Sequence, residues 1–132
     1  MTARDQTAST PRSTARAYTL AGQTVTAPPL APGLYLVATP IGNLRDVSLR
    51  ALEILAAADV IACEDTRVTH KLLSHYGIGT PLTPYHDHNA ASTRPKLIAR
   101  LAEGAMHTPW VPRNPRPIAG PAQLQEILEL AA

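Results

Sequence analysis

The amino-acid sequence predicts an α/β domain built on an incomplete parallel sheet with flanking helices. Between residues 33 and 104, short apolar runs alternate three times with stretches whose apolar residues recur at helical spacing. Glycine and proline residues separate these segments. Strands that are joined through helices run parallel with right-handed crossovers, so this alternation predicts the fold class. Both faces of such a sheet are normally covered, which agrees with the solid apolar character of the first two runs.

The first predicted strand spans residues 34–38 (Leu-Tyr-Leu-Val-Ala) and lies between Pro32-Gly33 and Thr39-Pro40. Asp46 or Ser48 can cap the helix that follows. The apolar face of that helix comprises Val47, Ala51, Ile54 and Ala58.

The second predicted strand spans residues 59–63 (Asp-Val-Ile-Ala-Cys), and we expect it to be buried. Thr66 can cap the next helix, and Gly77 ends it. The residues of this helix that we expect to point inward are Val68, Leu72, Leu73 and Tyr76.

A third and weaker strand is predicted over residues 81–85, because its two prolines lack the N–H groups that a sheet needs. Ser92 or Thr93 can cap the helix that follows, Pro95 fits its first turn, and Gly104 ends it. The apolar face of this helix comprises Leu97, Ile98 and Leu101.

Both ends of the chain lie outside this pattern. Residues 1–32 are rich in Thr, Ala, Pro, Ser and Arg, and we expect a disordered extension because such a composition buries too little surface to offset chain entropy. Residues 105–120 contain four prolines and predict an irregular segment in place of a fourth buried strand. Residues 121–132 predict a short helix. Residues 33–104 are therefore predicted to form a partial domain with a marginal core.

Composition excludes several classes of protein. The net charge is +2, with the basic excess near both ends, which fits nucleic-acid binding and solvated tails alike. No apolar run approaches the roughly 18 residues of a membrane span, and the N-terminus lacks the apolar core of a secretion signal. Cys63 is the single cysteine, so an internal disulfide is excluded and a reducing compartment is favoured. We therefore expect a cytoplasmic protein with no membrane association.

Three polar loops follow the three predicted strands, at the edge where parallel sheets bind ligands. The first spans residues 39–46 (Thr-Pro-Ile-Gly-Asn-Leu-Arg-Asp). Gly42 allows a ligand to approach the backbone closely, Asn43 tolerates unusual torsion angles, and the next helix offers free N–H groups to an anion. A plain strand-to-helix turn would have the same features, and a single glycine does not make a phosphate-binding motif.

The second loop spans residues 64–67 (Glu-Asp-Thr-Arg). In a functional interpretation, Asp65 holds a hydroxyl group or acts as a base, and Arg67 binds a phosphate. In a structural interpretation, the same residues cap a helix and form a surface ion pair. The residues alone leave both interpretations open.

The third loop spans residues 85–89 (Tyr-His-Asp-His-Asn). His86 and His88 are two residues apart, so they face the same way on an extended segment. No third ligand stands at metal-motif spacing, and we therefore predict no metal site. We expect substrate contacts here, or a helix cap at Asn89 with exposed histidines.

Together, the three loops resemble a known family. Thr-Pro-Ile-Gly-Asn-Leu-x-Asp (residues 39–46), Glu-Asp-Thr-Arg-x-Thr (64–69) followed by Leu72-Leu73, and His-x-His-Asn (86–89) occur in this order. They are similar to motifs of the small-subunit ribosomal RNA (cytidine-2′-O)-methyltransferases, which are members of the tetrapyrrole methylase superfamily. The resemblance covers residues 33–104. Each motif alone is weak, whereas three in register are specific.

The resemblance implies methyl transfer from S-adenosylmethionine to the ribose 2′-hydroxyl of a cytidine in small-subunit ribosomal RNA. It also implies two α/β domains with the cofactor between them, usually in a homodimer. Because a ribose hydroxyl needs an acceptor for its proton, Asp65 is our first candidate for the catalytic base and His86 the second. The residues expected beside the cofactor are Thr39, Pro40, Gly42 and Asn43, and those expected on the substrate side are Asp46, Arg67, His88 and Asn89.

Beyond Gly104 the sequence departs from this family, which continues with a strand, a Ser-Asp-Ala-Gly-Thr-Pro segment and a second domain. Residues 105–120 carry unrelated, proline-rich sequence instead, as a frameshift would produce. In the family, the missing loops form much of the cofactor pocket. We therefore expect this chain alone to bind S-adenosylmethionine weakly or not at all.

Two alternatives remain open from the sequence. The first is an inactive, truncated remnant that at most binds RNA or another protomer through unpaired strand edges. The second keeps the superfamily but changes the substrate to a tetrapyrrole, which the loops at residues 64–67 and 86–89 disfavour.

Overall fold

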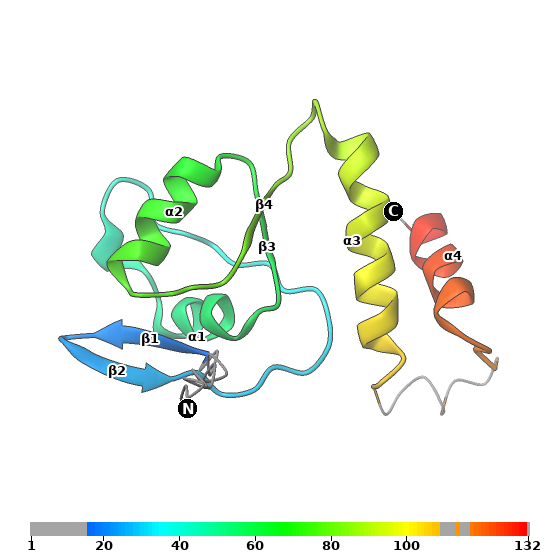
Figure 1. Cartoon of the computed structure of the whole chain (residues 1–132), viewed down its shortest axis with the longest axis horizontal. Coiled ribbons are helices and arrows are strands. Elements are labelled where there is room, and N and C mark those ends of the chain that lie inside the picture. The colour runs from blue at the N-terminus through cyan, green and yellow to red at the C-terminus, as the bar shows by residue number, and fades with distance from the viewer. Residues whose placement is uncertain (1–15, 109–112, 114–116, 132) are drawn as a thin grey trace, which may run out of the picture.

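The structure of the protein is a computed structural model, and it describes residues 16–108, 113 and 117–131. It confirms the predicted α/β class, with helices arranged around short strands (Figure 1). In chain order, the elements are β1 (Ala17–Leu20), β2 (Gln23–Thr26), a 3₁₀ turn (Leu44–Asp46), α1 (Leu49–Ala57), β3 (Ile61–Cys63), α2 (Thr66–His75), β4 (Leu82–Pro84), α3 (Ala90–Ala105) and α4 (Pro121–Ala131).

The parallel arrangement predicted for the second and third strands is confirmed. β3 pairs with β4 in parallel, and Ile61 lies opposite Leu82 and Cys63 opposite Pro84. The Tyr85 N–H donates to the Cys63 carbonyl at 2.8 Å, which extends the pairing by one residue. Helix α2 makes the crossover between these strands. The strands are shorter than predicted, and Ala62 in the middle of β3 is exposed, so the prediction of a fully buried strand is wrong.

The strand predicted over residues 34–38 does not form. This segment has no regular secondary structure, and the side chains of Leu34 and Leu36 are 76% and 87% exposed. A strand needs a neighbour to pair its backbone N–H and C=O groups. In the described part of the chain, the parallel sheet consists of β3 and β4 alone. The apolar composition of the segment was therefore not sufficient to predict its conformation.

The prediction that residues 1–32 form a disordered extension is wrong for residues 17–26, which form an antiparallel hairpin of β1 and β2. Residues 1–15 lie outside the described part of the chain. Ala21 and Gly22 make its two-residue turn with φ angles of 50° and 78°, as in a type I′ turn. Tyr18 is 4% exposed and joins the core, so the hairpin is stabilised by packing that the overall composition of residues 1–32 did not indicate.

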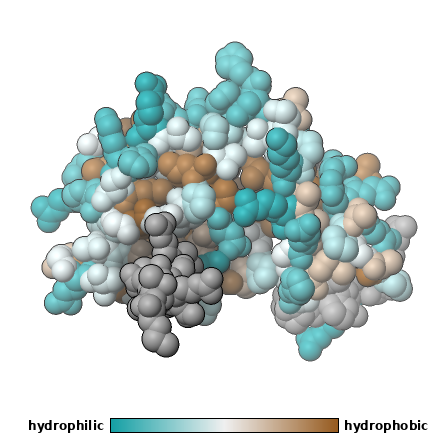
Figure 2. Space-filling view, in the orientation of Figure 1, coloured by the Kyte–Doolittle hydropathy of each residue, from teal (hydrophilic) through white to brown (hydrophobic). Residues whose placement is uncertain are grey.

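In the described part of the chain, an apolar cluster lies between the hairpin, α1 and α2. Leu52 of α1 is fully buried at its centre. The prediction that Val68 of α2 points inward is wrong, because its side chain is 63% exposed. On the face drawn in Figure 2, apolar surface gathers over the α1–α2 part of the molecule and is surrounded by hydrophilic side chains. The buried members of the cluster are Tyr18, Ala27, Leu52, Leu55, Ala56, Ala57, Leu72, Leu73, Tyr76 and Ile78.

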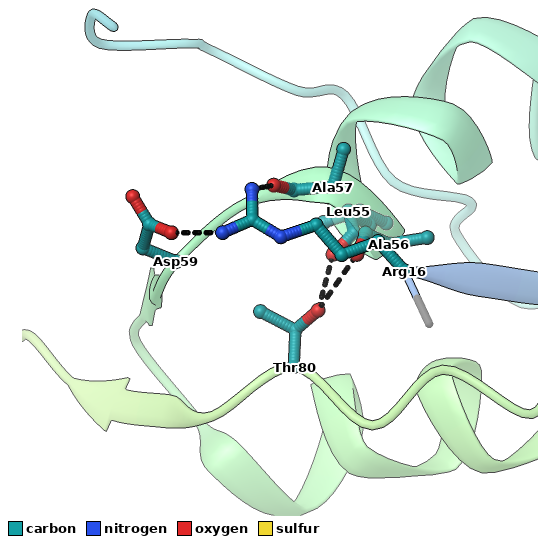
Figure 3. Close-up of polar contacts among 6 residues, drawn as sticks. All are labelled: Arg16, Leu55, Ala56, Ala57, Asp59 and Thr80. Carbon is teal, nitrogen blue, oxygen red and sulfur yellow. Dashed lines mark hydrogen bonds and ion pairs between the residues drawn. The ribbon is translucent and has the colours of Figure 1, made fainter. Parts of the chain in front are cut away.

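Polar side chains satisfy the carbonyl groups at the end of α1 (Figure 3). The Thr80 hydroxyl donates to the Leu55 carbonyl at 2.7 Å, and the Arg16 guanidinium donates to the Ala57 carbonyl. Arg16 also forms an ion pair with Asp59. The last carbonyls of a helix have no partner within it, and a cation is favourable at that end. These contacts therefore connect the hairpin and the segment before β4 to α1.

The helix boundaries correct several cap predictions. Ser48 caps α1 as predicted, because its hydroxyl accepts from the Ala51 N–H at 3.1 Å. Asp65 rather than Thr66 caps α2. Helix α3 begins after Asn89, so Ser92 and Thr93 lie inside it and not at its cap.

The end of α3 and the segment after it also differ from the prediction. Pro95 is the sixth residue of α3 and lies beyond its first turn, and Gly104 lies one residue before the helix ends. Helix α4 forms where the last helix was predicted and packs beside α3 (Figure 1). Within the proline-rich segment, residues 109–112 and 114–116 lie outside the described part of the chain.

Candidate functional site

Two of the three polar loops lie at one edge of the parallel strands. Cys63 and Pro84 are paired at the ends of β3 and β4, so the chain leaves both strands at the same place. Glu64 and Asp65 follow β3, and residues 85–89 follow β4. Ligands bind at this edge of open parallel sheets. The Asp65 and His86 loops are therefore neighbours.

The Asp65 carboxylate is engaged within its own loop. Its Oδ1 accepts from the main-chain N–H of Arg67 at 2.9 Å, which is the N-cap bond of α2. Its Oδ2 lies 3.1 Å from Nη2 of the Arg67 guanidinium. The hydrogen bonds and charge of Arg67 lower the pKa of Asp65, and Asp65 in turn raises the pKa of Arg67. A lower pKa makes the carboxylate a weaker base, which argues against Asp65 as the proton acceptor.

Asn89 closes the loop that carries His86. Its side-chain Oδ1 accepts from the His86 N–H at 2.9 Å, and its Nδ2 donates to the Pro84 carbonyl at 2.8 Å. Both ends of the amide are thus bound to the main chain of the same loop. The geometry makes Asn89 a residue that holds the loop shape between β4 and α3. It stands at the N-cap position of α3, which is one of the two roles that the sequence predicted, and the substrate contact stays a prediction.

His86 carries an unusual polar atom. Its Nδ1 is buried, and no hydrogen-bond partner for it occurs among the described residues. An unsatisfied buried nitrogen costs about 1–3 kcal/mol, so a hydroxyl that donated to it would remove that cost. His88 is exposed, and its ring lies edge-on to the His86 ring with 5.9 Å between the centroids.

A polar pocket of about 400 Å³ opens beside His86. The Arg94 guanidinium lies at this pocket, and its Nε donates to the Tyr85 hydroxyl at 3.1 Å. The volume lies within the range of roughly 300–1,000 Å³ that is typical of ligand sites. The residues that line the pocket are Glu64, Tyr85, His86, Asp87, Ala90 and Arg94.

The first loop does not join this pocket. The Tyr76 hydroxyl donates to the Leu44 carbonyl at 2.9 Å, which places the loop at the C-terminal end of α2. Asp65 caps the opposite end of that helix (Figure 1). The prediction that all three loops converge is therefore wrong in this structure. The physical reason is the missing strand over residues 34–38, which would have carried this loop to the sheet edge.

Within the first loop, the polar side chains bond to one another. Asn43 accepts from the Arg45 N–H at 3.2 Å and donates to Asp46 Oδ1 at 3.1 Å. Gly42 has a φ of 85° with open space beside it, and Ile41 is 99% exposed. The residues that were expected to bind the cofactor, Thr39, Pro40, Gly42 and Asn43, thus lie on an open, exposed turn rather than in an enclosed cavity.

Comparison with known families shows which family the chain belongs to. Residues 33–108 match the model of the tetrapyrrole (corrin/porphyrin) methylases. The chain belongs to this family. The match covers both the first loop and the pocket at the edge of β3 and β4.

The chain is similar to several curated relatives, each named ribosomal RNA small subunit methyltransferase I. The relative from Mesorhizobium japonicum is 63% identical over 86 residues, which are 64% of this chain and 29% of the relative. The relative from Erythrobacter litoralis is 57% identical over 76 residues, 58% of this chain and 27% of the relative. The relative from Escherichia coli O157:H7 is 55% identical over 71 residues, 54% of this chain and 25% of the relative. The chain therefore spans less than a third of the length of these relatives.

Sequence reasoning assigned no role to four polar residues that line the pocket: Glu64, Tyr85, Asp87 and Arg94. Glu64, Tyr85 and Asp87 lay inside the polar loops. The signal for Arg94 was its position eight residues after His86, on the second turn of a helix that starts at the loop.

Among residues 16–108, 113 and 117–131, no helix is long and apolar enough to cross a membrane. In the same residues, no three His, Cys, Asp or Glu side chains group as metal ligands do.

Proposed function

We propose that this chain is part of a ribosomal RNA methyltransferase that methylates the ribose 2′-hydroxyl of a cytidine in small-subunit ribosomal RNA. S-adenosylmethionine is the proposed methyl donor. The relatives' shared name, together with 51–63% identity, supports the ribosomal RNA substrate. A cytoplasmic location and a homodimer belong to the same proposal.

The observation that carries the proposal is the pocket beside His86 at the sheet edge. Methyl transfer from a sulfonium to a hydroxyl is an in-line displacement, so the protein mainly has to align the two groups. The hydroxyl is a poor nucleophile and must lose its proton as the bond forms. A nucleotide in the pocket would bring its ribose to the residues that can accept that proton.

We assign the proton acceptor to Nδ1 of His86. No described residue hydrogen-bonds this nitrogen, so in the tautomer that carries the ring proton on Nε2 its lone pair can accept the hydroxyl hydrogen. Asp65, the first candidate from the sequence, has its carboxylate bound to Arg67 and its pKa lowered. Its proposed role is therefore to cap α2 and keep the Glu64–Arg67 loop in shape. Asn89 holds His86 through the main chain.

The turn over residues 39–43 does not by itself fit S-adenosylmethionine. It is open to solvent, and its Asn43 amide is bound to Arg45 and Asp46. A cofactor of this size needs an enclosed pocket that buries most of its surface. This chain alone thus contributes the acceptor side of the reaction, and cofactor binding requires further residues.

The exposed apolar segment favours a second candidate for the isolated chain. Leu34, Leu36 and Ile41 are all more than three-quarters exposed, which is unusual for large apolar side chains near a predicted sheet. Such a chain could bind RNA or another protomer without transferring a methyl group. This candidate matches the inactive remnant considered from the sequence.

A chimera tests the proposed function. Residues 33–104 of this chain replace the matching segment of the Mesorhizobium relative, and the protein is incubated with S-adenosylmethionine and unmodified small ribosomal subunits. We expect 2′-O-methylcytidine, measured by mass spectrometry of the digested RNA, at a rate within about tenfold of the intact relative. A folded chimera that forms none would refute the proposal. The 132-residue chain alone is the comparison, and we expect no turnover from it.

Variants of the chimera test the assignment of the base. His86→Ala should lower the rate about 10²- to 10⁴-fold, as loss of a general base does. Asp65→Asn should lower it less than tenfold, because asparagine still caps a helix. The reverse order of effects would move the proton-accepting role to Asp65.

A further inference from the structure

The pocket beside His86 is lined by charged residues of both signs that form no ion pair with one another in the described part of the chain. Glu64 and Asp87 are the acidic residues that line it, and Arg94 is the basic one. In the described part of the chain, neither of the two ion pairs involves these residues. The Tyr85 hydroxyl accepts from Nε of Arg94 and fixes the plane of the guanidinium. The carboxylates and the outer guanidinium nitrogens are thus available to a ligand.

These charges restrict the chemistry of the ligand. A phosphate is disfavoured, because the carboxylates outnumber the guanidinium around the pocket. A metal ion is disfavoured as well, because Arg94 repels it and the described residues form no metal-binding group. A neutral molecule with a hydrogen-bond donor next to an acceptor satisfies both charges at once.

We propose that this pocket receives the base of the target nucleotide, and that Glu64 and Arg94 distinguish cytosine from uracil. This inference rests on the proposed function. The amino group of cytosine donates to the Glu64 carboxylate, a pairing that proteins use to recognise cytosine. The carbonyl oxygen of the base accepts from Arg94. Uracil carries an oxygen in place of the amino group, and a carboxylate opposite that oxygen is repelled.

The aromatic side chain at the pocket supports this assignment. Tyr85 is half-buried and lines the cavity. Proteins that bind single-stranded RNA stack unpaired bases on aromatic rings and read their hydrogen-bonding edges. Enzymes that modify nucleotides also place the base in a pocket, where its edge is read. Tyr85 would supply the stacking surface, and Glu64 and Arg94 would read the edge.

RNA binding by the 132-residue chain tests the inference. The probes are fluorescein-labelled single-stranded RNAs of twelve nucleotides, one of uridines only and one with a central cytidine. Fluorescence anisotropy gives both dissociation constants. For the unmodified chain, we expect about tenfold tighter binding of the cytidine probe, as one hydrogen bond to a charged group gives. Glu64→Gln should lose most of that preference, because its amide can also donate to uracil.

The control is Glu103→Gln, which removes the same charge from an exposed position of α3 that does not line the pocket. This variant should keep the preference for cytidine. Arg94→Gln should weaken the binding of both probes, because both bases present a carbonyl oxygen. If Glu64→Gln keeps the preference, or if the unmodified chain shows none, the inference is wrong while the proposed function stands. If the chain binds neither RNA, the inference is wrong, and the chimera assay tests the proposed function separately.

Discussion

At Gly77, where the end of α2 contacts the hairpin, the backbone cost and the steric cost of adding a side chain can be measured separately. Gly77, just after α2, has a φ of 63°, and a Cβ placed on it would lie 2.9 Å from Thr19 Oγ1 of β1. The left-handed conformation costs a residue with a Cβ roughly 1–2 kcal/mol. Moving the stiff Thr19 side chain away from its preferred angle costs roughly 0.5–1.5 kcal/mol more. We therefore expect Gly77→Ala to lower the free energy of unfolding by about 1.5–3.5 kcal/mol.

Two other glycines provide matched controls. Gly42 has a φ of 85° but open space around a Cβ, so Gly42→Ala should show the backbone cost alone. Gly79 has open space and lies outside the left-handed region, so Gly79→Ala should be nearly neutral. Urea unfolding followed by far-ultraviolet circular dichroism measures all three variants. In a Thr19→Ala background, the cost of Gly77→Ala should fall to that of Gly42→Ala.

Equal stability of the Gly77→Ala and Gly79→Ala variants would refute this reasoning. It would mean that Gly77 does not adopt the left-handed conformation. A cost equal to that of Gly42→Ala would mean that the hairpin does not pack against the end of α2 as the structure has it. A full cost of Gly77→Ala that persists without the Thr19 hydroxyl would refute the steric part only.

The remaining predictions concern the two loops at the sheet edge. Asn89→Ala loses its hydrogen bonds to the Pro84 carbonyl and the His86 N–H, so the free energy of unfolding should fall by about 1–2 kcal/mol. His88→Ala, the control, should change the free energy of unfolding little. Equal effects of the two variants in urea unfolding would contradict the role of Asn89. The lowered pKa of Asp65 means that its pair with Arg67 stabilises the fold above the unfolded pKa of about 3.9 and loses that contribution as the pH falls through the lower, folded pKa. The stability difference between the unmodified chain and Asp65→Asn, measured by thermal unfolding from pH 7 to pH 2, should therefore stay constant down to about pH 5 and then shrink. A difference that grew toward low pH would show the opposite sign.

Much of the fold was predictable because the deciding interactions are local. The positions of α1, α2 and α4 follow from apolar residues at helical spacing, and the Ser48 cap follows from its hydroxyl just before that pattern. The parallel pairing of β3 and β4 follows from the helix between them. The motifs within residues 39–89 also indicated the family that the match over residues 33–108 establishes.

The failures occur where conformation depends on a distant partner. Leu34 and Leu36 have the character of a buried strand but are exposed, because the described chain offers no strand beside them. Tyr18 lies in a segment of low apolar content, yet it is buried by α1 and α2, which come later in the sequence. A local sequence pattern shows neither whether a neighbouring strand is present nor whether later helices bury a side chain.

The candidate site, like the fold, was determined partly by local sequence and partly by contacts that only the tertiary structure makes. The sequence alone determined which loops carry polar chemistry and that two of them follow adjacent parallel strands. Only the tertiary structure decided which carboxylate is available, because Asp65 is bound by Arg67 once α2 forms, whereas Glu64 faces a pocket with Arg94. The physical reason is that hydrogen bonds, charge and burial act between atoms that the fold brings together, and those distances are not encoded at any single position.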